Sequence, residues 1–364
     1  MTTGLSAHAG EQRVRLSAPS DILATIPFLV GYYPADSIVV LGMREKRVTF
    51  TARDDLPSAD DGTLAEHVSG LVTILLRQDC ANVMIVGFGP EERVTPMLNA
   101  LRDAYWEAGV AVLESLRAHE GRYWSYLCDN PSCCPPEGRS YDPGSSAVAA
   151  TWTINGRVAL RDRAEYEAQI QPATGAVRAA MSQTTFEAQE RLIELLGACD
   201  DDEQAAAALL TAGNLAIAEA LDRQLHDAAL THDEVAWLTV LLISIQVRDI
   251  AWSLIQGSGA VVFQHRALWQ DVVHRAEPDL VPAPASLFAF AAWRCGDGGI
   301  ARLALERALD QDPRYRMAVL LHEAITQGLP PSALDGFPST PARRARPGRR
   351  RSSKSRLRSA RGAR

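Results

Sequence analysis

Residues 81–89 read ANVMIVGFG, a short apolar run that is typical of a buried strand. Apolar residues recur at helical spacing on both sides of this run, which predicts a helix before it and another after it: Leu64, Val68, Leu71, Val72 and Leu75 in the first, and Val94, Leu98, Leu101 and Tyr105 in the second. VAVLESLRA (110–118) then predicts the next strand. This order of strand, helix and strand predicts a partly parallel sheet with helices packed on it.

Further strands and one helix are expected around this unit. SIVVLGM (37–43) and RVTFTAR (47–53) predict two strands that form a hairpin. SDILATIPFLVG (20–31) predicts a helix before the hairpin, and RYWSYL (122–127) predicts a strand near the end of the unit. The first part of the chain is therefore expected to be α/β, with a mixed sheet and flanking helices.

The second half of the chain has a helical pattern almost throughout. THDEVAWLTVLLISIQVRDIAW (231–252) begins with a capping box of Thr231 and Glu234, and its apolar residues follow the helical period. Other helices are expected near 185–197, 203–226, 284–295, 299–310 and 314–327. The expected fold is thus an α/β domain followed by an all-α helical domain and a disordered, basic C-terminal tail.

Length and composition agree with two domains. The chain has 364 residues, 47% of them apolar, which excludes global disorder and allows a substantial core. The patterns place the boundaries as follows: a disordered segment at 1–12, the α/β domain at 13–155, the helical domain at 156–338 and a disordered Arg-rich tail at 339–364.

The sequence favours a cytoplasmic protein that does not cross a membrane. The N-terminal residues, MTTGLSAHAGEQRVR, lack the apolar region of a secretory signal. The longest apolar run, LTVLLISIQV (238–247), is shorter than the roughly 20 residues that span a bilayer. We therefore expect that run to belong to a buried helix.

The net charge of −7 hides an acidic body and a basic tail. Residues 341–364 hold 11 of the 37 Lys and Arg residues and no Asp or Glu, so the remainder carries 26 positive and 44 negative charges, a net charge of −18. A segment with so much charge and so few apolar residues is expected to be disordered. Its charge predicts weak, non-specific binding to nucleic acid at low salt.

Five stretches, in this order, resemble one family: SAPSDILATIPFLVGYYPADSIVVLG (17–42), ARDDLP (52–57), GRYWSYLCDNPSCCPPEG (121–138), VRDIAW (247–252) and WRCGDGGIARLALERALDQDPRYRMA (293–318). The chain resembles the actinobacterial family called domain of unknown function 4192, over roughly residues 14–330. The family brings no established activity, so the resemblance implies that these stretches belong together and implies nothing about a substrate.

Three cysteines lie close together in the chain, at Cys128, Cys133 and Cys134. A structural zinc site needs four ligands, usually from two Cys pairs, and no second pair is present, although His119 could add a ligand. A disulfide from Cys128 to Cys133 or Cys134 could close across so short a loop, but a reducing cytoplasm opposes it. We expect a rigid structural loop first, a redox-switchable bond second, and neither a metal nor a cofactor.

Polar and aromatic side chains gather where expected strands begin and end: Asp36, Ser37, Arg53, Asp55, Arg122, Trp124 and Tyr126. Ligands of α/β sheets bind beyond strand ends, where Arg53 and Arg122 could hold an anion and Trp124 could stack on a ring. This hypothesis requires Arg53, Asp55 and Arg122 to converge at one edge of the sheet. The alternative, which we favour, is a surface ion pair between Arg53 and Asp55, with the aromatic residues covering the sheet.

Known catalytic and nucleotide-binding motifs give no clearer function. GFGPEE (87–92) follows a strand, but Glu92 stands where the dinucleotide motif needs a third glycine. The sequence therefore favours a non-enzymatic cytoplasmic binding or scaffold protein. The alternative is a small-molecule-binding protein or an enzyme that uses the strand-end residues, and a pocket uniting Arg53, Asp55 and Arg122 would favour it.

Overall fold

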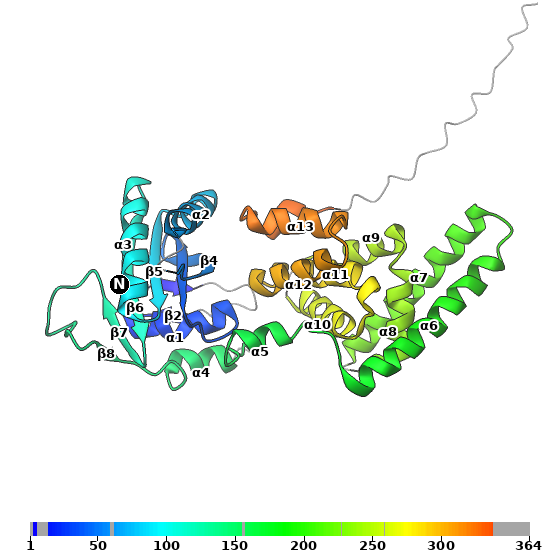
Figure 1. The fold of residues 1–364 in the computed structure, drawn as a ribbon, viewed down its shortest axis with the longest axis horizontal. Coiled ribbons are helices and arrows are strands. Elements are labelled where there is room, and N and C mark those ends of the chain that lie inside the picture. Colours follow the sequence, from blue (N-terminus) through cyan, green and yellow to red (C-terminus); the bar gives the residue numbers. More distant parts are fainter. Residues whose placement is uncertain are drawn as a thin grey trace, which may run out of the picture.

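The structure is a computed structural model that describes residues 3–5, 14–58, 62–154, 157–226, 228–257 and 259–337. Its two parts, an α/β unit and a helical unit, lie side by side (Figure 1). The expected fold class, a mixed sheet with flanking helices followed by many helices, is confirmed. The tail expected to be disordered lies outside the described residues.

The α/β unit is built on a six-stranded sheet with the strand order β4-β3-β5-β6-β7-β8. Its strands are β3 (Ser37–Arg44), β4 (Arg47–Asp55), β5 (Asn82–Phe88), β6 (Ala111–His119), β7 (Arg122–Ser125) and β8 (Arg139–Ser140). β5 and β6 are parallel, and all other neighbours are antiparallel. The βαβ segment therefore supplies the parallel pair, and hairpins extend the sheet on both sides.

Helices cover both faces of the sheet, which explains why β5 is apolar at successive positions. On one face lie α2 (Leu64–Arg77) and α3 (Glu91–Glu107), which form a core with Val83 and Ile85. On the other face lie α1 (Pro19–Val30) and α4 (Ala147–Ile154), which form a core with Met84 and Val86. Alternate residues of β5 thus enter different cores, and both cores need apolar side chains.

The N-terminal segment differs in part from the expectation. Thr3–Leu5 forms β1 and pairs antiparallel with β2 (Val14–Leu16), so this part of 1–12 is regular structure. Three residues are too short a run to be recognised by alternation alone. The other residues of 1–12 lie outside the described part of the chain.

The helical unit consists of α5 (Arg163–Ala168), α6 (Gly175–Gly197), α7 (Asp202–Leu225), α8 (His232–Leu241), α9 (Ile245–Leu254), α10 (Ala260–Arg275), α11 (Pro282–Arg294), α12 (Gly298–Gln311) and α13 (Arg316–Thr326), with two short 3₁₀ turns, η1 (Pro278–Leu280) and η2 (Pro331–Leu334). Eleven consecutive residues from Ala283 to Trp293 of α11 are buried, so α11 is the centre of this unit. Figure 1 shows α6 and α7 at the end farthest from the sheet.

Two features of the helical unit differ from the sequence prediction. The segment 231–252 is two helices, α8 and α9, which meet at an angle of 112°. The backbone N–H groups of Ile243 and Ser244 donate to carbonyls three residues earlier, which tightens the last turn and ends α8. The prediction also omitted α10, whose buried residues are separated by polar ones.

The two units contact each other in two places. Near the connecting segment, the backbone N–H of Tyr33 donates to Leu160 O at 3.0 Å and that of Leu160 donates to Gly31 O at 2.9 Å. At the opposite side, Arg77 of α2 donates to the carbonyl of Gln327 at 2.8 Å, just after α13. Hydrogen bonds at both places favour a fixed arrangement of the two units.

Candidate functional site

The strand-end residues lie along one edge of the sheet, but they do not converge. β5 and β6 end at this edge, and Ser37 is paired with both Asp55 and Phe88 there. Three strands, β3, β5 and β6, separate β4 from β7. At about 4.8 Å per strand this separation is roughly 19 Å. The prediction that Arg122 joins Arg53 and Asp55 is therefore wrong, because the β3–β4 hairpin places β4 on the outer side of β3.

Arg53 and Asp55 instead pair with each other and with the helical unit. Arg53 Nη1 lies 2.7 Å from Asp55 Oδ1, and Arg163 Nη1 lies 2.9 Å from Asp55 Oδ2. Partial burial works to raise the pKa of the Asp55 carboxyl, but the charges and hydrogen bonds of the two arginines outweigh it and lower that pKa. This cluster is an ion-pair network, as the alternative prediction held, and it reaches across the junction to α5.

Tyr166 of α5 is the centre of the junction. A Cβ atom at Gly31 would lie 2.6 Å from its Cε2, and one at Gly299 would lie 2.9 Å from its hydroxyl oxygen. The Tyr166 hydroxyl donates a hydrogen bond to Asp297. Burial, and then the Asp297 carboxylate, raise the pKa of Tyr166 well above its ordinary value, so the hydroxyl keeps its proton. The Tyr166 ring therefore fits only because glycine lies on both sides.

Asp36 and Ser37 lie beside this cluster and have structural contacts. Asp36 has a φ of 43°, and its carboxylate lies 2.7 Å from the Arg93 guanidinium of α3. Arg93 also donates to the carbonyl of Leu56 at 3.0 Å, which ties the start of β3 to the residue after β4. Ser37 is fully buried, and its hydroxyl has no partner among the described residues.

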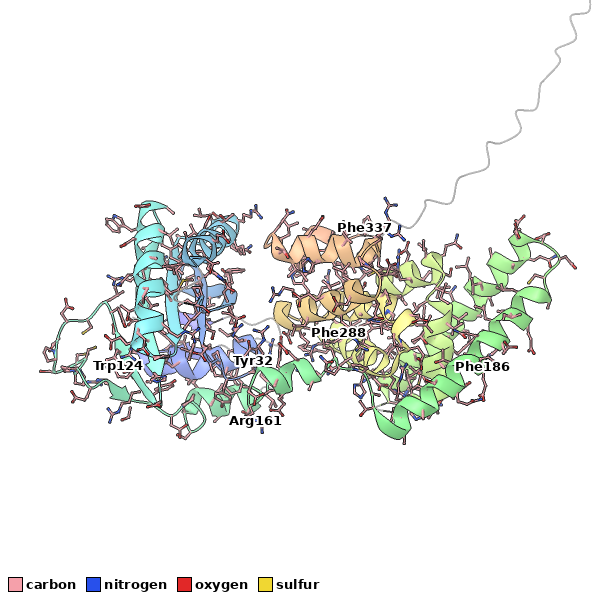
Figure 2. The ribbon with its side chains drawn as sticks, in the orientation of Figure 1. Tyr32, Trp124, Arg161, Phe186, Phe288 and Phe337 are labelled. Carbon is pink, nitrogen blue, oxygen red and sulfur yellow. The ribbon has the colours of Figure 1, made fainter. Side chains whose placement is uncertain are left out.

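Arg122, Trp124 and Tyr126 lie on the far side of the sheet; Figure 2 shows Trp124 well away from Tyr32. The Arg117 guanidinium covers the Trp124 ring at 3.6 Å, and Trp124 Nε1 donates to the carbonyl of Pro136 at 2.9 Å. Arg122 donates to the Gly138 carbonyl at 3.0 Å, and the Tyr126 hydroxyl lies 2.6 Å from Thr95 Oγ1. These side chains hold the loop that follows β7.

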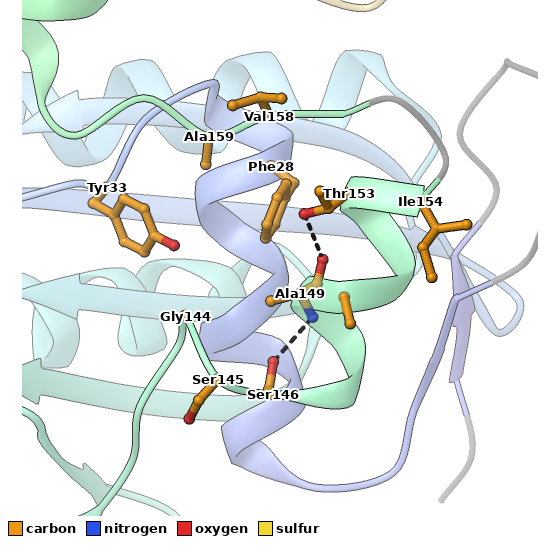
Figure 3. Close-up of a pocket in the computed structure, with 11 residues that line it drawn as sticks. Phe28, Tyr33, Gly144, Ser145, Ser146, Ala149, Thr153, Ile154, Val158 and Ala159 are labelled. Carbon is orange, nitrogen blue, oxygen red and sulfur yellow. Dashed lines mark hydrogen bonds between the residues drawn. The ribbon is translucent and has the colours of Figure 1, made fainter.

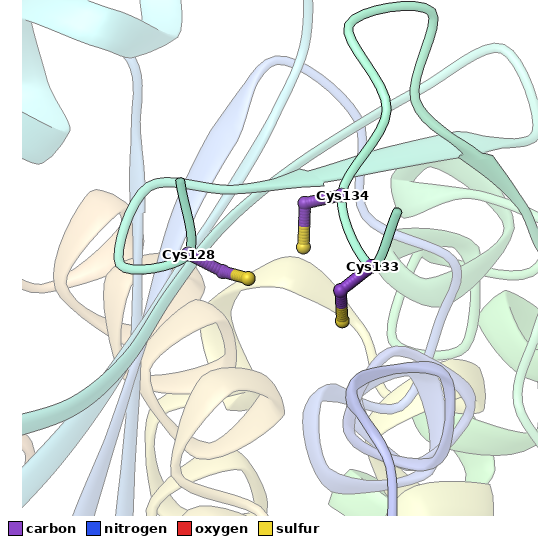
Figure 4. A group of neighbouring side chains, drawn as sticks. All are labelled: Cys128, Cys133 and Cys134. Atoms are coloured by element: carbon purple, nitrogen blue, oxygen red, sulfur yellow. The ribbon is translucent and has the colours of Figure 1, made fainter. Parts of the chain in front are cut away.

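That loop brings three thiols together. The sulfur atoms of Cys128, Cys133 and Cys134 all lie within 4.8 Å of one another, and Figure 4 shows them converging from two arms of the loop. In the described part of the chain, no other group of three or more His, Cys, Asp or Glu side chains comes this close together. His119 is not in the group; its ring lies 3.9 Å from the Glu120 carboxylate.

The three thiols differ in acidity. A backbone hydrogen bond from Asn130, followed by hydrogen bonds with the neighbouring thiols, lowers the pKa of Cys128. Burial, followed by the hydrogen bonds with Cys128 and Cys133, raises the pKa of Cys134 to about 12. One thiolate therefore forms readily, and its neighbours resist losing their protons unless a cation is added. A soft metal ion is the cation that these ligands suit.

A pocket lies on the α1–α4 face of the sheet, apart from the strand-end residues. Its cavity volume is about 440 Å³, and Figure 3 shows the hydroxyl of Tyr33 directed into it. The lining is mainly apolar with several hydroxyl groups: Phe28, Tyr33, Gly144, Ser145, Ser146, Ala149, Ala150, Thr153, Ile154, Val158 and Ala159. The volume lies within the usual range of small-molecule pockets.

Sequence reasoning missed the junction residues Arg163, Tyr166 and Asp297. Arg163 and Tyr166 lie outside the five stretches that resemble the family, and Asp297 lies in a stretch treated only as a helix break. One signal was present, because GYY, ARDD and CGDGG are polar or glycine-rich segments on otherwise apolar elements. Their convergence on α5 shows that these stretches form one junction.

Comparison with known proteins gives a family and no activity. The family described as "Domain of unknown function (DUF4192)" matches residues 19–332, which include both units and the junction. No curated protein and no solved structure matches the chain. Since the match extends over most of the sequence, the chain belongs to the domain of unknown function 4192 family.

Proposed function

We propose that this protein is a non-enzymatic cytoplasmic binding or scaffold protein, and that its α6–α7 hairpin binds a basic, amphipathic helix of a partner protein. The ion pairs at the strand ends support the non-enzymatic part of this proposal. An enzyme that used these residues would need them around a substrate, whereas Arg53 and Asp55 pair across the junction and Arg122 holds a loop.

The observation that carries the proposal is the exposure of apolar side chains on the hairpin. The side chains of Phe186 and Ile193 on α6 are 58% and 63% exposed, and that of Leu215 on α7 is 59% exposed. Phe186 and Ile193 are seven residues apart and so share one face, opposite to Met181 and Ala188, which are buried. An apolar face of this kind favours a protein contact.

A membrane is the competing use of an apolar helix. Within the described residues, α7 is long and apolar enough to span a bilayer by length and composition, and α8 with α9 passes the same test only as a bent pair. However, α7 packs through Gly213, Ala216, Ile217 and Ala220 into the helical unit. Acidic residues also stand at both of its ends, which disfavours insertion.

The charge of the hairpin indicates the occupant. Residues 182–222 contain nine Asp and Glu residues and a single basic residue, Arg191, which gives a net charge of −8. A second copy of the hairpin, with the same charge, would be repelled, and so would an anionic membrane surface. A helix with apolar residues on one face and Lys or Arg at its sides matches both properties of the surface.

The test is a binding titration with a fluorescent probe peptide of about 18 residues, five helical turns, composed of Leu and Lys at helical spacing. The full-length protein should bind it, with an affinity that falls as salt rises. Phe186→Glu and Ile193→Glu should each weaken binding about tenfold, because each removes apolar contact area worth more than about 1.4 kcal/mol.

Trp106→Glu is the matched control, because Trp106 is 82% exposed on α3, far from the hairpin. It should leave the affinity unchanged. Equal binding by all variants, or equal binding of a peptide with Glu in place of Lys, would contradict the proposal. So would a dimer that the Phe186→Glu variant dissolves, or binding to lipid vesicles with no binding to the peptide.

A second candidate function is small-molecule binding in the pocket beside α1 and α4. Its volume and its mixed apolar and hydroxyl lining favour a small, mainly apolar ligand. Native mass spectrometry of the purified protein would show such a ligand as added mass. Ala150→Phe, at an exposed position of the lining, should remove that mass while the fold persists. Retention of the mass would place the ligand elsewhere.

A further inference from the structure

The cysteine loop has the geometry of a metal site. Around a tetrahedral zinc ion with Zn–S bonds of about 2.3 Å, sulfur atoms lie about 3.8 Å apart. The three sulfur atoms of the loop all lie within 4.8 Å of one another, so a small inward rotation of the side chains completes the arrangement. We propose that Cys128, Cys133 and Cys134 bind one Zn²⁺ ion through three thiolates.

The loop backbone is already arranged to present these three sulfur atoms. The N–H groups of Cys133 and Cys134 both donate to the carbonyl of Asn130, at 3.0 and 2.7 Å, which fixes a tight turn. The side-chain oxygen of Asn130 accepts from the Ser132 N–H at 3.0 Å. Arg139 of β8 donates to the carbonyls of Ser132 and Cys133 from outside the turn. Such a frame positions ligands before a metal arrives.

The loop lacks the apolar core that would hold its shape without a crosslink. Between Leu127 and Arg139, only Gly138 is buried, and the other residues are exposed or half-buried. Trp124 fixes the end of the loop, because Gly138 has a φ of 76° and its Cβ position would lie 2.5 Å from the ring. The turn that carries the thiols has no comparable anchor, and small segments without a core are commonly fixed by a metal or a disulfide.

A metal uses all three thiols, whereas a disulfide uses only two. Cys133 and Cys134 are adjacent, and consecutive Cα atoms lie about 3.8 Å apart, closer than disulfides usually allow. A bond from Cys128 to either one would leave the third thiol with no role. Three thiolate ligands favour Zn²⁺ over harder ions such as Mg²⁺ or Ca²⁺.

The charge and the open coordination position complete the description. Zinc with three thiolates carries a net charge of −1, and the guanidinium groups of Arg122 and Arg139 lie at the base of the loop. Binding releases up to three thiol protons, so affinity should rise with pH. Three protein ligands leave the fourth position of the tetrahedron for water.

The test is the metal content of the full-length protein, purified without oxygen and without added chelator. Elemental analysis should give close to one zinc per chain. Each of Cys128→Ser, Cys133→Ser and Cys134→Ser should reduce it to below about a tenth. Cys199→Ser is the matched control, because Cys199 lies outside the cluster, and it should keep the full zinc content.

A second measurement does not depend on the variants folding. Co²⁺ added to the metal-free wild-type protein should produce a sulfur-to-cobalt charge-transfer band and the intense visible bands of tetrahedral Co²⁺, and Zn²⁺ should remove both. Absence of these bands, zinc that persists in Cys133→Ser, or a Cys128 disulfide found by mass spectrometry after rapid thiol blocking would overturn the proposal. Iron with inorganic sulfide in place of zinc would also overturn it.

Discussion

The Tyr166 hydroxyl donates a hydrogen bond to the Asp297 carboxylate, which joins α5 to the start of α12 across 131 residues of sequence. Arg266 approaches the same carboxylate at 3.1 Å, and the N–H of Ile300 donates to it at 3.4 Å. Asp297 is thus the cap of α12 and also the acceptor for the residue that fills the junction. The two units are therefore fixed to each other by a buried polar contact.

Tyr166→Phe should lower the free energy of unfolding by about 1.5 kcal/mol, as measured by urea denaturation. It removes a hydrogen bond to a charged acceptor, and such bonds contribute about 1.5–3 kcal/mol. The lower figure applies because Asp297 keeps Arg266 and Ile300 as partners.

Tyr105→Phe is the matched control for this substitution. Tyr105 is fully buried in the α/β unit, and its hydroxyl has no hydrogen-bond partner among the described residues. Removing it should leave stability unchanged or raise it, because a buried hydroxyl without a partner is unfavourable. Equal losses in the two variants would show that the contact with Asp297 contributes nothing.

Gly31→Ala should be more harmful than an alanine at another left-handed glycine. Gly31 has a φ of 96° and Gly257 has a φ of 80°, so both substitutions add about 1–2 kcal/mol of backbone strain. Only at Gly31 does the new Cβ meet the Tyr166 ring; nothing lies within 4 Å of it at Gly257. Urea denaturation should show a further loss of about 1–3 kcal/mol at Gly31. Equal losses would mean that Tyr166 does not constrain this position.

His265 should make the protein sensitive to acid. It is buried on α10, and burial outweighs its hydrogen bond to the Leu254 backbone and lowers its pKa from 6.5 to about 4. The folded state therefore binds fewer protons than the unfolded state between these values. Stability is complete above about pH 6.5 and falls by up to about 3 kcal/mol as the pH approaches 4.

The measurement is denaturation at several pH values, with His265→Gln compared with wild type. The variant should lose less stability between pH 6.5 and 4, since it has no titrating group there. His226→Gln, whose imidazole is 68% exposed, should behave as wild type. A wild-type pH dependence that His265→Gln fails to reduce would assign the sensitivity to other groups.

The basic tail, which lies outside the described residues, should bind nucleic acid weakly and without sequence preference. Residues 341–364 carry eleven positive charges and no negative ones. Filter binding should show an affinity for DNA or RNA that falls steeply with salt. A chain truncated after Pro338 should lose this binding. Equal binding by the truncated chain, or binding insensitive to salt, would exclude the tail as an electrostatic contact.

The sequence predicted those parts of the fold that follow from local pattern. The strands β3, β4, β5 and β6 and most helices have apolar residues at regular spacing, so periodicity was sufficient to find them. The bend between α8 and α9 was not predicted, because apolar residues continue through it and only the hydrogen bonds of Ile243 and Ser244 show the break.

The candidate sites depended on contacts that periodicity does not contain. Arg53 and Arg122 both stand at strand ends, but only the strand order shows that three strands separate them. Cys128 is separated by four residues from Cys133, and this spacing resembles half a zinc site; only the fold of the loop shows that Cys134 completes a cluster. Tyr166 had no motif, and its role comes from the glycines that accommodate it.

The central claim is that the partner binds to the α6–α7 hairpin and not to the strand ends. Hydrogen–deuterium exchange of the full-length protein, with and without saturating probe peptide, tests it most directly. The account predicts slower exchange in 182–196 and 205–222, and unchanged exchange in 33–37 and 52–56. Slower exchange at the strand ends or around the pocket beside α1, with the hairpin unchanged, would contradict it.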